Sequence, residues 1–293
     1  MPALPTGSVD LILCDPPYGT IKGLPLRGWS EETTAWDGVI APEMLFSLCE
    51  RVLRVNGALV LFAREPYTSQ LITRIHGNLP FSYRMVWNKK YFASPLMAGK
   101  APVSLFEDVV VFFKKYDSGK THPLRAYARR ILEFVGLKSS KAVNRVLGHR
   151  RAEHFFQHDT LQFGLCTRDT YSHLVSRFNL EQMPGFMAYD EILAIHRRVS
   201  GRVFNLPSGQ KHKPNVLEYA RERERYHPTQ KPIALLEDLI CTYSNPGDTV
   251  LDFTMGSGST GVACMRTGRC FVGIEKDGHY FSVAKQRLER EAE

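Results

Sequence analysis

The segment that decides the fold is TVLDFTMGSGSTG, residues 249–261. Its first half is an apolar run of strand length, and the glycine-rich half opens a helix. Gly256, Gly258 and Gly261 fit the spacing G-x-G-x-x-G, and an acid, Glu275, follows nineteen residues after the first glycine. Glycines let a backbone approach a ligand closely, and an acid at the next strand end accepts hydrogen bonds from ribose hydroxyls. The segment therefore predicts a nucleoside site that would serve NAD, FAD or S-adenosylmethionine equally well.

The position of this glycine loop distinguishes between these cofactors. Only eighteen residues follow Glu275, which is enough for one helix over 279–291. A dinucleotide site needs a second mononucleotide-binding half, usually downstream, and there is no room for one. The strands that complete the sheet must then come from residues 9–115, before the loop. This permuted order disfavours a nicotinamide enzyme.

The N-terminal part of the chain alternates between strand and helix patterns. VDLILC (9–14) is a continuous apolar run, as expected for a strand buried on both faces. We predict helices over 42–55, ended by Asn56-Gly57, and around 66–77, with strands over 58–63, 82–89 and 107–115. The alternation returns after residue 226. One helix starts at Pro232, and a second, opened by the glycine loop, ends near Arg266; strands are predicted over 249–253 and 270–275. This pattern predicts an α/β fold with a mostly parallel sheet covered on both faces.

The middle of the chain carries the basic charge. The net charge of the chain is +8. The segment from Lys114 to Arg151 contains eleven Lys or Arg residues and two acids, a local charge of +9, so the rest of the chain has a net charge of −1. A basic block of this kind favours nucleic acid over an evenly charged, solvated surface. Within it, RAYARRILEFVG, LKSS and KAVNRVLG predict two short helices around a tight turn. They are read either as a DNA-binding helix-turn-helix, which we favour, or as an ordinary helical hairpin.

Cysteines, histidines and hydropathy give weaker indications. The six cysteines are scattered without a CxxC pair, which indicates reduced thiols and neither a disulfide framework nor a zinc site. His154 and His158 stand at i, i+4, which we interpret as one helix face and not as metal ligands. We expect no metal and no membrane contact, because no apolar run approaches spanning length. The expected location is the cytoplasm.

Three motifs in register resemble one enzyme family. Asp15-Pro16-Pro17-Tyr18, then HPTQKP (227–232), then Asp252-Phe253 with the glycine loop, are similar to the motifs of DNA amino-methyltransferases of the beta group. In that group the catalytic motif precedes the cofactor motif. Trp36-Asp37, Trp87-Asn88-Lys89 and Glu107-Asp108 also stand where family members have similar residues. The resemblance covers about 9–115 and 226–291, and implies a Rossmann-like, S-adenosylmethionine-dependent methyltransferase fold with a helical basic insertion.

The resemblance implies roles for individual residues. Asp15, the Pro16 carbonyl, Pro17 and Tyr18 would form the catalytic motif, with the carboxylate and carbonyl accepting from the target amino group and Tyr18 stacking on the base. Thr229 and Lys231 would reach the cofactor's carboxylate, although Lys231 could equally cap a helix. The residues expected to bind the cofactor are Asp15, Thr229, Lys231, Asp252, Phe253, Thr254, Gly256, Ser257, Gly258, Glu275 and Lys276.

The same resemblance implies a three-part organisation and a double-stranded DNA partner. Residues 1–115 and 226–293 would form the catalytic and cofactor-binding halves, and 116–225 the target recognition insertion. The side chains expected to contact DNA are Lys138, Lys141, Arg145, Arg150 and Arg151. We expect the loop over 19–37 to act as a lid and not only as a connector. Homodimers and restriction-modification partners are common in this family.

Several functions remain open from the sequence alone. Adenine-N6 methylation is favoured, because an aspartate at the first motif position is typical of adenine enzymes and a serine of cytosine-N4 enzymes in this family. Cytosine-N4 methylation is the alternative. A DNA-binding protein that has lost catalysis would have an altered tetrapeptide or glycine loop, and neither is altered here. Methylation of a protein glutamine ranks last, because it normally goes with asparagine in place of Asp15.

Overall fold

The computed structural model describes residues 1, 3–19, 38–74, 76–91, 99, 102–222, 226–227 and 229–293. The predicted lid loop therefore lies largely outside the described residues. By their contacts the described residues divide into two compact units, which are treated one at a time. The first consists of Met1–Leu53, Gly57–Lys114 and Val203–Glu293, and the second of Arg54–Asn56 and Lys115–Arg202.

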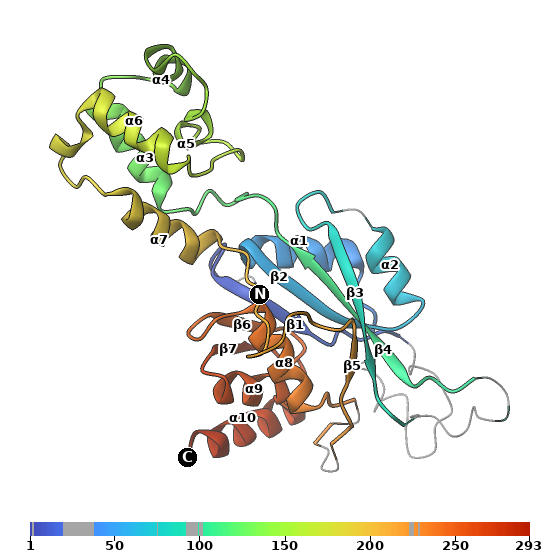
Figure 1. The fold of residues 1–293 in the computed structure, drawn as a ribbon. Coiled ribbons are helices and arrows are strands. Elements are labelled where there is room, and N and C mark those ends of the chain that lie inside the picture. Colours follow the sequence, from blue (N-terminus) through green and yellow to red (C-terminus); the bar gives the residue numbers. More distant parts are fainter. Residues whose placement is uncertain are drawn as a thin grey trace. The chain divides into compact units, whose positions relative to one another are not determined.

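Seven strands of the first unit form one sheet in the order β5-β3-β4-β2-β1-β6-β7 (Figure 1). The strands β1, β2 and β6 run parallel, as do β6 with β7 and β3 with β5, whereas β4 is antiparallel to both of its neighbours. The sheet is thus mostly parallel, as predicted, with one reversed strand. The strands are β1 (Val9–Cys14), β2 (Leu53–Ala63), β3 (Phe81–Asn88), β4 (Phe106–Phe113), β5 (Val216–Glu218), β6 (Thr249–Asp252) and β7 (Cys270–Gly273).

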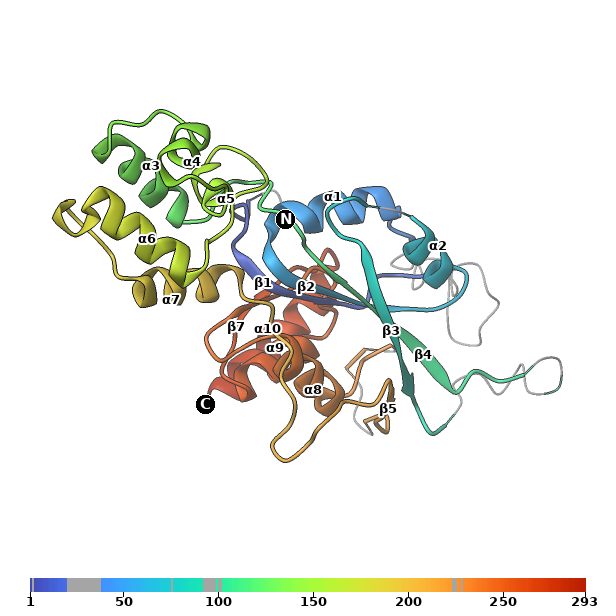
Figure 2. The same ribbon diagram turned by 45° about the horizontal axis from the view of Figure 1, so that its top comes forward.

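Helices cover both faces of this sheet, which confirms the predicted α/β fold (Figure 2). Alternate residues of β1 divide between the two faces: Leu11 and Leu13 pack with one helix layer, and Ile12 and Cys14 with the other. One layer is α8 (Ile233–Tyr243) and α9 (Ser259–Arg266), with α10 (Gly278–Ala292) against α9; the other is α1 (Pro42–Val52) and α2 (Tyr67–Thr73). No helix in these described ranges is long and apolar enough to cross a membrane.

The junction between α1 and β2 differs from the prediction. We expected the helix to run to residue 55 and Asn56-Gly57 to end it, but α1 ends at Val52 and β2 begins at Leu53. Leu53 pairs with Val9 in the sheet, and the register then shifts before Ala58. Asn56, with φ 59°, lies in this irregular stretch of the strand. Strand pairing therefore outweighed the local helix pattern.

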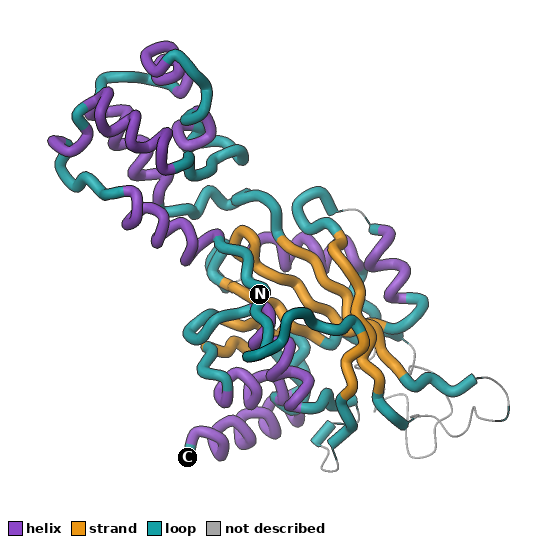
Figure 3. The backbone as a smooth tube through the Cα atoms, viewed as in Figure 1, coloured by secondary structure: helices purple, strands orange, loops and turns teal. Residues whose placement is uncertain are grey.

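The second unit contains only helices and loops over residues 115–202 (Figure 3). It has its own apolar core, built around side chains such as Tyr127, Phe155 and Leu174. The predicted insertion ran over 116–225, whereas this unit ends at Arg202, since Val216–Glu218 pairs with β3 in the sheet. Its helices are α3 (Leu124–Phe134), α4 (Ser140–Leu147), α5 (Glu153–Phe156), α6 (Arg168–Phe178), the 3₁₀ helix η3 (Leu180–Gln182) and α7 (Tyr189–Ser200).

The two helices expected around a tight turn are confirmed as α3 and α4. The first helix, α3, ends at Phe134, and Gly136, with φ 68°, lies in the turn that follows it. The Ser139 hydroxyl accepts a hydrogen bond from the Ala142 amide and caps α4, and Gly148 ends that helix in the left-handed conformation. The predicted helix face over 154–158 is wrong, because α5 ends at Phe156 and the His158 ring pairs with Asp159 at 3.0 Å.

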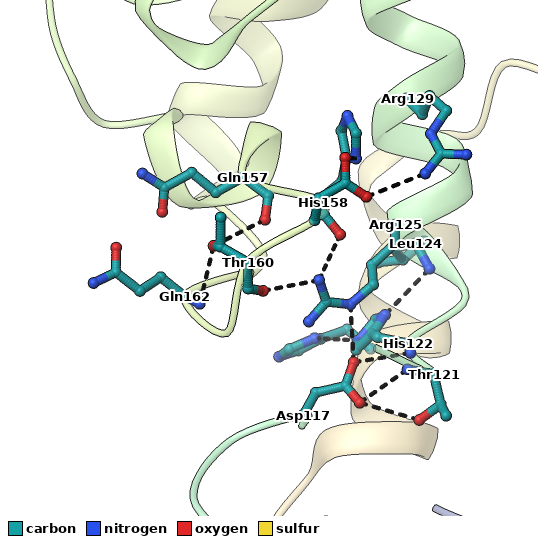
Figure 4. A network of polar contacts seen from close by, with 12 residues as sticks. Asp117, Thr121, His122, Leu124, Arg125, Arg129, Gln157, His158, Thr160 and Gln162 are labelled. Carbon is teal, nitrogen blue, oxygen red and sulfur yellow. Dashed lines mark hydrogen bonds and ion pairs between the residues drawn. The ribbon is translucent and has the colours of Figure 1, made fainter. Parts of the chain in front are cut away.

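A buried polar network fixes the start of α3 (Figure 4). The Asp117 carboxylate accepts hydrogen bonds from the backbone amides of Thr121 (2.9 Å) and His122 (3.1 Å), and from Arg125 Nε (2.9 Å). The Arg125 guanidinium also donates to the carbonyl of Thr160 at 2.9 Å. Arg125 thus belongs to the basic block in sequence but serves the interior of the second unit.

Candidate active site

The predicted catalytic tetrapeptide, residues 15–18, directly follows β1 at its carboxyl end. Pro16 is buried and the other three residues are partly buried. The Tyr18 hydroxyl donates a hydrogen bond to Asp15 Oδ1, and the Tyr18 ring lies 6.3 Å from the Tyr67 ring. The tetrapeptide therefore holds its own carboxylate at the edge of the sheet.

The structure brings this tetrapeptide beside the glycine loop. Strands β1 and β6 are parallel neighbours, so their carboxyl ends meet at one edge. The Phe253 amide donates to Cys14 Sγ at 3.2 Å, which joins the last residue of β1 to the first residue after β6. The crevice at the carboxyl ends of such strands is the usual ligand site of open α/β sheets.

The Asp252 carboxylate is committed to the protein interior. Its side chain accepts hydrogen bonds from the Thr254 amide (3.0 Å) and the Thr260 hydroxyl (2.6 Å), and only 4% of the residue is exposed. Burial raises the pKa of Asp252 to about 6. Its predicted role in cofactor binding stays a prediction, and its contacts show that it shapes the loop that follows β6.

The glycine loop is closed by Glu275. Gly256, with φ 51°, donates its amide to Glu275 Oε2 at 2.9 Å, and the other carboxylate oxygen accepts from the Asp277 amide at 2.9 Å. Gly258 has φ 80°, and a Cβ there would lie 3.0 Å from the Cβ of Ala284. Only glycine suits that position. Each Glu275 oxygen can accept a second hydrogen bond, so the carboxylate retains capacity for a ligand.

The other predicted cofactor residues are distributed around the loop. The Thr229 hydroxyl lies 3.1 Å from His227 Nδ1, and the Ser257 hydroxyl donates to Gln230 Oε1 at 3.2 Å. Burial lowers the pKa of His227 to about 4, so its ring is neutral at pH 7. Lys276 is exposed. His227 and Gln230 were not selected from the sequence, although they stand in the HPTQKP motif.

The side chain of Lys231 contacts two carboxylates. Its ammonium donates to Asp15 Oδ2 and lies 3.2 Å from Glu107 Oε2, and its side chain is only 6% exposed. Lys89 pairs with the other Glu107 oxygen at 2.5 Å. Lys231 therefore pairs with the Asp15 carboxylate of the predicted catalytic tetrapeptide, and its ion pairs are with side chains and not with the end of α8. Glu107 and Lys89 were noted in the sequence for their family resemblance but were not among the predicted site residues.

Strand direction explains why Glu107 reaches this edge. Because β4 is antiparallel to β2, with Asp108 opposite Ala63, the first residues of β4 lie at the carboxyl end of β2. Trp87, near the end of β3, pairs with Glu107, and Lys89 follows two residues later. The sequence feature that indicates this position is the acidic pair Glu107-Asp108, which directly precedes the apolar run of β4.

Electrostatics at this cluster follow from burial and charge. Burial raises the pKa of Asp15, and the Lys231 ammonium opposes that rise. Burial also favours the neutral form of Lys231, but the two carboxylates outweigh it and raise the pKa of Lys231. Burial would raise the Glu107 pKa too, yet Lys231 and Lys89 together hold it below its usual value. Burial lowers the pKa of Lys89, and its ion pair with Glu107 opposes that change.

A cavity of about 480 Å³ lies elsewhere in the first unit. Residues of α8, α9 and α10 line it, among them Arg266 and Arg287, and it includes none of the predicted site residues. Arg266 pairs with Glu291 at 2.6 Å, and Arg287 donates to the Ser259 hydroxyl at 2.9 Å. The cavity is therefore separate from the site built here.

In the second unit, most of the basic block faces solvent. Of the eleven cations of the block, Lys114 of the first unit and Arg125 of the second are buried, and the other nine are exposed. Arg150 forms two hydrogen bonds to Glu153, at 2.6 and 3.0 Å. The five residues predicted to contact DNA all belong to the exposed group: Lys138, Lys141, Arg145, Arg150 and Arg151.

Comparison with known proteins gives one family. The family described as DNA methylase matches residues 9–286 of the chain. The DNA adenine methyltransferase YhdJ of Escherichia coli strain K12 is 26% identical over 291 residues, which is 98% of this chain and 78% of that protein.

Two solved structures share the fold. The M1.HpyAVI–SAM complex superposes with a TM-score of 0.52 at 22% identity, covering 96% of this chain and 90% of that one. The PvuII DNA methyltransferase, named as cytosine-N4-specific, gives a TM-score of 0.52 at 15% identity, covering 99% of this chain and 86% of that one. At these identities the likeness concerns the fold alone.

Proposed function

Because this chain belongs to the DNA methylase family, we propose that it transfers a methyl group from S-adenosylmethionine to the N6 amino group of adenine in double-stranded DNA. The observation that carries the proposal is the shared edge of the sheet, where the Asp15 carboxylate at the end of β1 adjoins the glycine loop at the end of β6. The adenine preference draws support from the relative named as a DNA adenine methyltransferase.

The residues around the glycine loop fit S-adenosylmethionine. Gly256 and Gly258 have positive φ and leave the loop without side chains, which allows a ligand to approach its backbone. Glu275 can accept from ribose hydroxyls. Thr229 contacts His227, whose ring lies beside Gly256, and would meet the methionine part. Phe253, partly buried, offers an apolar wall. When bound, the cofactor supplies a methyl group on a positively charged sulfur.

The work of Asp15 is to make a poor nucleophile reactive. The lone pair of an aromatic amino nitrogen is delocalised into its ring. Acceptors for its two N–H groups favour tetrahedral geometry and stabilise the positive charge that develops there. Asp15 would supply one acceptor and the Pro16 carbonyl the second, held by the fixed φ of proline. Tyr18 would stack on the target base after it leaves the duplex.

The second unit would supply the affinity for DNA. Its exposed cations can neutralise phosphates, and this interaction dominates protein–DNA affinity. Lys141 and Arg145 stand four residues apart on α4, the second helix of the helix pair. We propose that α4 is the element that contacts the duplex.

Cytosine-N4 methylation remains the second candidate. The PvuII enzyme, named for that base, shares the fold, so the fold alone does not choose the base. Incubation of unmethylated DNA with labelled S-adenosylmethionine, followed by digestion to nucleosides, decides between the two. We expect N6-methyladenine, and label in N4-methylcytosine alone would contradict the proposal.

An Asp15→Ala variant is the control for this measurement. It removes the acceptor for the target amino group, so methyl transfer should fall below detection, while DNA affinity in a gel-shift assay stays within about twofold because the exposed cations of the second unit are unchanged. Undiminished transfer by this variant would remove Asp15 from the mechanism.

A further inference from the structure

The ion-pair partners of Asp15 form a buried row of alternating charge. Lys231 contacts Asp15 and lies 3.2 Å from Glu107, and Glu107 in turn pairs with Lys89 at 2.5 Å. The two lysine side chains are 6% and 3% exposed. Two carboxylates and two ammonium groups cancel, which is how charges are retained in a protein interior.

Each oxygen of Asp15 already accepts one donor. Oδ1 accepts from the Tyr18 hydroxyl and Oδ2 accepts from the Lys231 ammonium. Under the proposed function, the amino group of the target base needs one of these oxygens. Each oxygen keeps a second lone pair, but an ammonium on Asp15 offsets the carboxylate charge that would stabilise the positive charge developing on that amino group, so withdrawal of Lys231 when the base binds would favour the reaction.

Glu107 offers the place to which Lys231 can withdraw. Its Oε2 atom is buried and accepts no hydrogen bond from the described residues, although Lys231 Nζ is only 3.2 Å away. Its other oxygen is fixed by Lys89. An ammonium has three N–H donors, so a small rotation of the Lys231 side chain would convert the existing ion pair into a hydrogen bond.

We propose that Glu107 is a positioning residue that receives the Lys231 ammonium when the target amino group takes its place on Asp15. This inference rests on the proposed function. The exchange moves an ammonium group and transfers no proton, so Lys231 keeps its three N–H bonds. Lys89 keeps Glu107 charged and in place, so the charge of the row is the same before and after the exchange.

Other charged groups face this row. Tyr18 and Lys231 contact Asp15, and repulsion from Asp15 acts on Asp252. Arg64 faces Tyr18, and Arg221 faces Lys89. Of these, Lys231 is the cation that lowers the Asp15 pKa by direct contact. Loss of Lys231 would therefore raise the pKa of Asp15 further.

Two other accounts of Lys231 make different predictions. If Lys231 left Asp15 to bind the carboxylate of the cofactor, its loss would weaken cofactor binding. If the row were only structural, its variants would lose stability without a selective loss of rate. The measurements are therefore single-turnover methyl transfer at saturating cofactor, cofactor affinity by calorimetry, and the thermal midpoint Tm.

The first variant is Glu107→Gln, which keeps the shape and removes the negative charge that receives Lys231. We expect its transfer rate to fall about 10- to 100-fold, the range for losing one hydrogen bond to a charged group. Its cofactor affinity should stay within about twofold of wild type. The Glu107→Asp variant keeps the negative charge that pairs with Lys89, but its shorter side chain places the carboxylate oxygen farther from Lys231. It should therefore fold and still have a lower methyl-transfer rate.

The second variant, Lys231→Met, tests the order of action. Transfer should become pH-dependent and recover as the pH rises, because Asp15 then ionises only above its raised pKa. Since Glu107 acts through Lys231, adding Glu107→Gln to Lys231→Met should cost no further rate. Lys213→Met, which breaks a buried pair with Asp238 in the same unit, is the matched control and should retain the rate.

The outcomes separate the two proposals. A wild-type enzyme that transfers no methyl group to any DNA overturns the proposed function and this inference with it. An active wild type beside an equally active Glu107→Gln variant overturns only the role of Glu107. So does a Glu107→Gln variant whose loss appears in cofactor affinity or Tm, with a normal rate at saturation.

Discussion

At the scale of single residues, Asp252 combines burial with an ionisable group. Its carboxylate meets the Thr254 amide and the Thr260 hydroxyl within the loop, without a cation in direct contact among the described residues. Burial raises its pKa from 3.8 to about 6. The folded state therefore binds this proton more tightly than the unfolded state does, and stability is lost as the pH rises through 6.

An Asp252→Asn variant should escape this loss. Between pH 5 and pH 7.5, the wild type should lose about 1 kcal/mol of unfolding free energy relative to the variant, since one pKa unit corresponds to about 1.4 kcal/mol. Urea unfolding at the two pH values measures the difference. A difference that does not change with pH would contradict the raised pKa.

Asp117 provides the matched comparison. Burial would raise its pKa, but the amides of Thr121 and His122 and the Arg125 guanidinium together hold it below its usual value. Its contribution to stability is then present above the ordinary pKa and is lost only in more acidic solution. An Asp117→Asn variant should be less stable than wild type by the same amount at pH 5 and at pH 7.5.

At the scale of elements, α4 is a short helix whose exposed side is basic. Val143 and Leu147 are buried in the core of the second unit, while Lys141 and Arg145 face solvent. The helix thus has one side for packing and one for contact. Its Ser139 cap and its C-terminal Gly148 fix both of its ends.

Substitution of both α4 cations, Lys141→Gln with Arg145→Gln, should weaken DNA binding uniformly across sequences. Removing one cation that pairs with a phosphate reduces the slope of log affinity against log salt concentration by about 1. Fluorescence anisotropy at several salt concentrations measures this slope. The control is Arg177→Gln, an exposed cation at the end of α6; an equal weakening in that variant would assign the effect to overall charge.

At the scale of the whole molecule, the two units have separate apolar cores. The sheet unit packs two clusters, one on each face, and residues 115–202 pack a third. No tryptophan lies within 115–202, and Trp87, the one tryptophan among the described residues, is buried in the sheet unit. Tryptophan fluorescence therefore reports on the sheet unit, whereas far-UV circular dichroism also reports on the helices of the second unit.

Because each unit has its own core, a Leu174→Ala variant should unfold in two separable steps. Leu174 is fully buried in the second unit, and the cavity left by the substitution should cost about 2–5 kcal/mol there. The circular dichroism transition should move to lower urea while the fluorescence transition stays. Leu239→Ala, in the sheet unit, should move the fluorescence transition. Coincident shifts in both variants would mean a single cooperative unit.

Much of the fold was determined by local sequence patterns. Neighbouring residues are enough to predict the apolar strands β1 and β6, the start of α8 after a proline, and the glycine loop. Strand burial and positive φ restrict which residues fit at these places. The tetrapeptide at the end of β1 and the loop at the end of β6 could thus be assigned to one edge. Where tertiary pairing competed with a local pattern, as at Leu53, the sequence prediction was wrong.

Only the tertiary structure decided what surrounds Asp15. Lys231 is 216 residues away in the chain, and no local rule brings the two together. Glu107 reaches the same edge because β4 runs against β2, so that its first residues lie where the parallel strands end. Strand direction is a property of the assembled sheet, since hydrogen-bond pairing with both neighbours fixes it. The sequence by itself determined the carboxylate and the glycine loop, and the sheet topology determined the charges that face them.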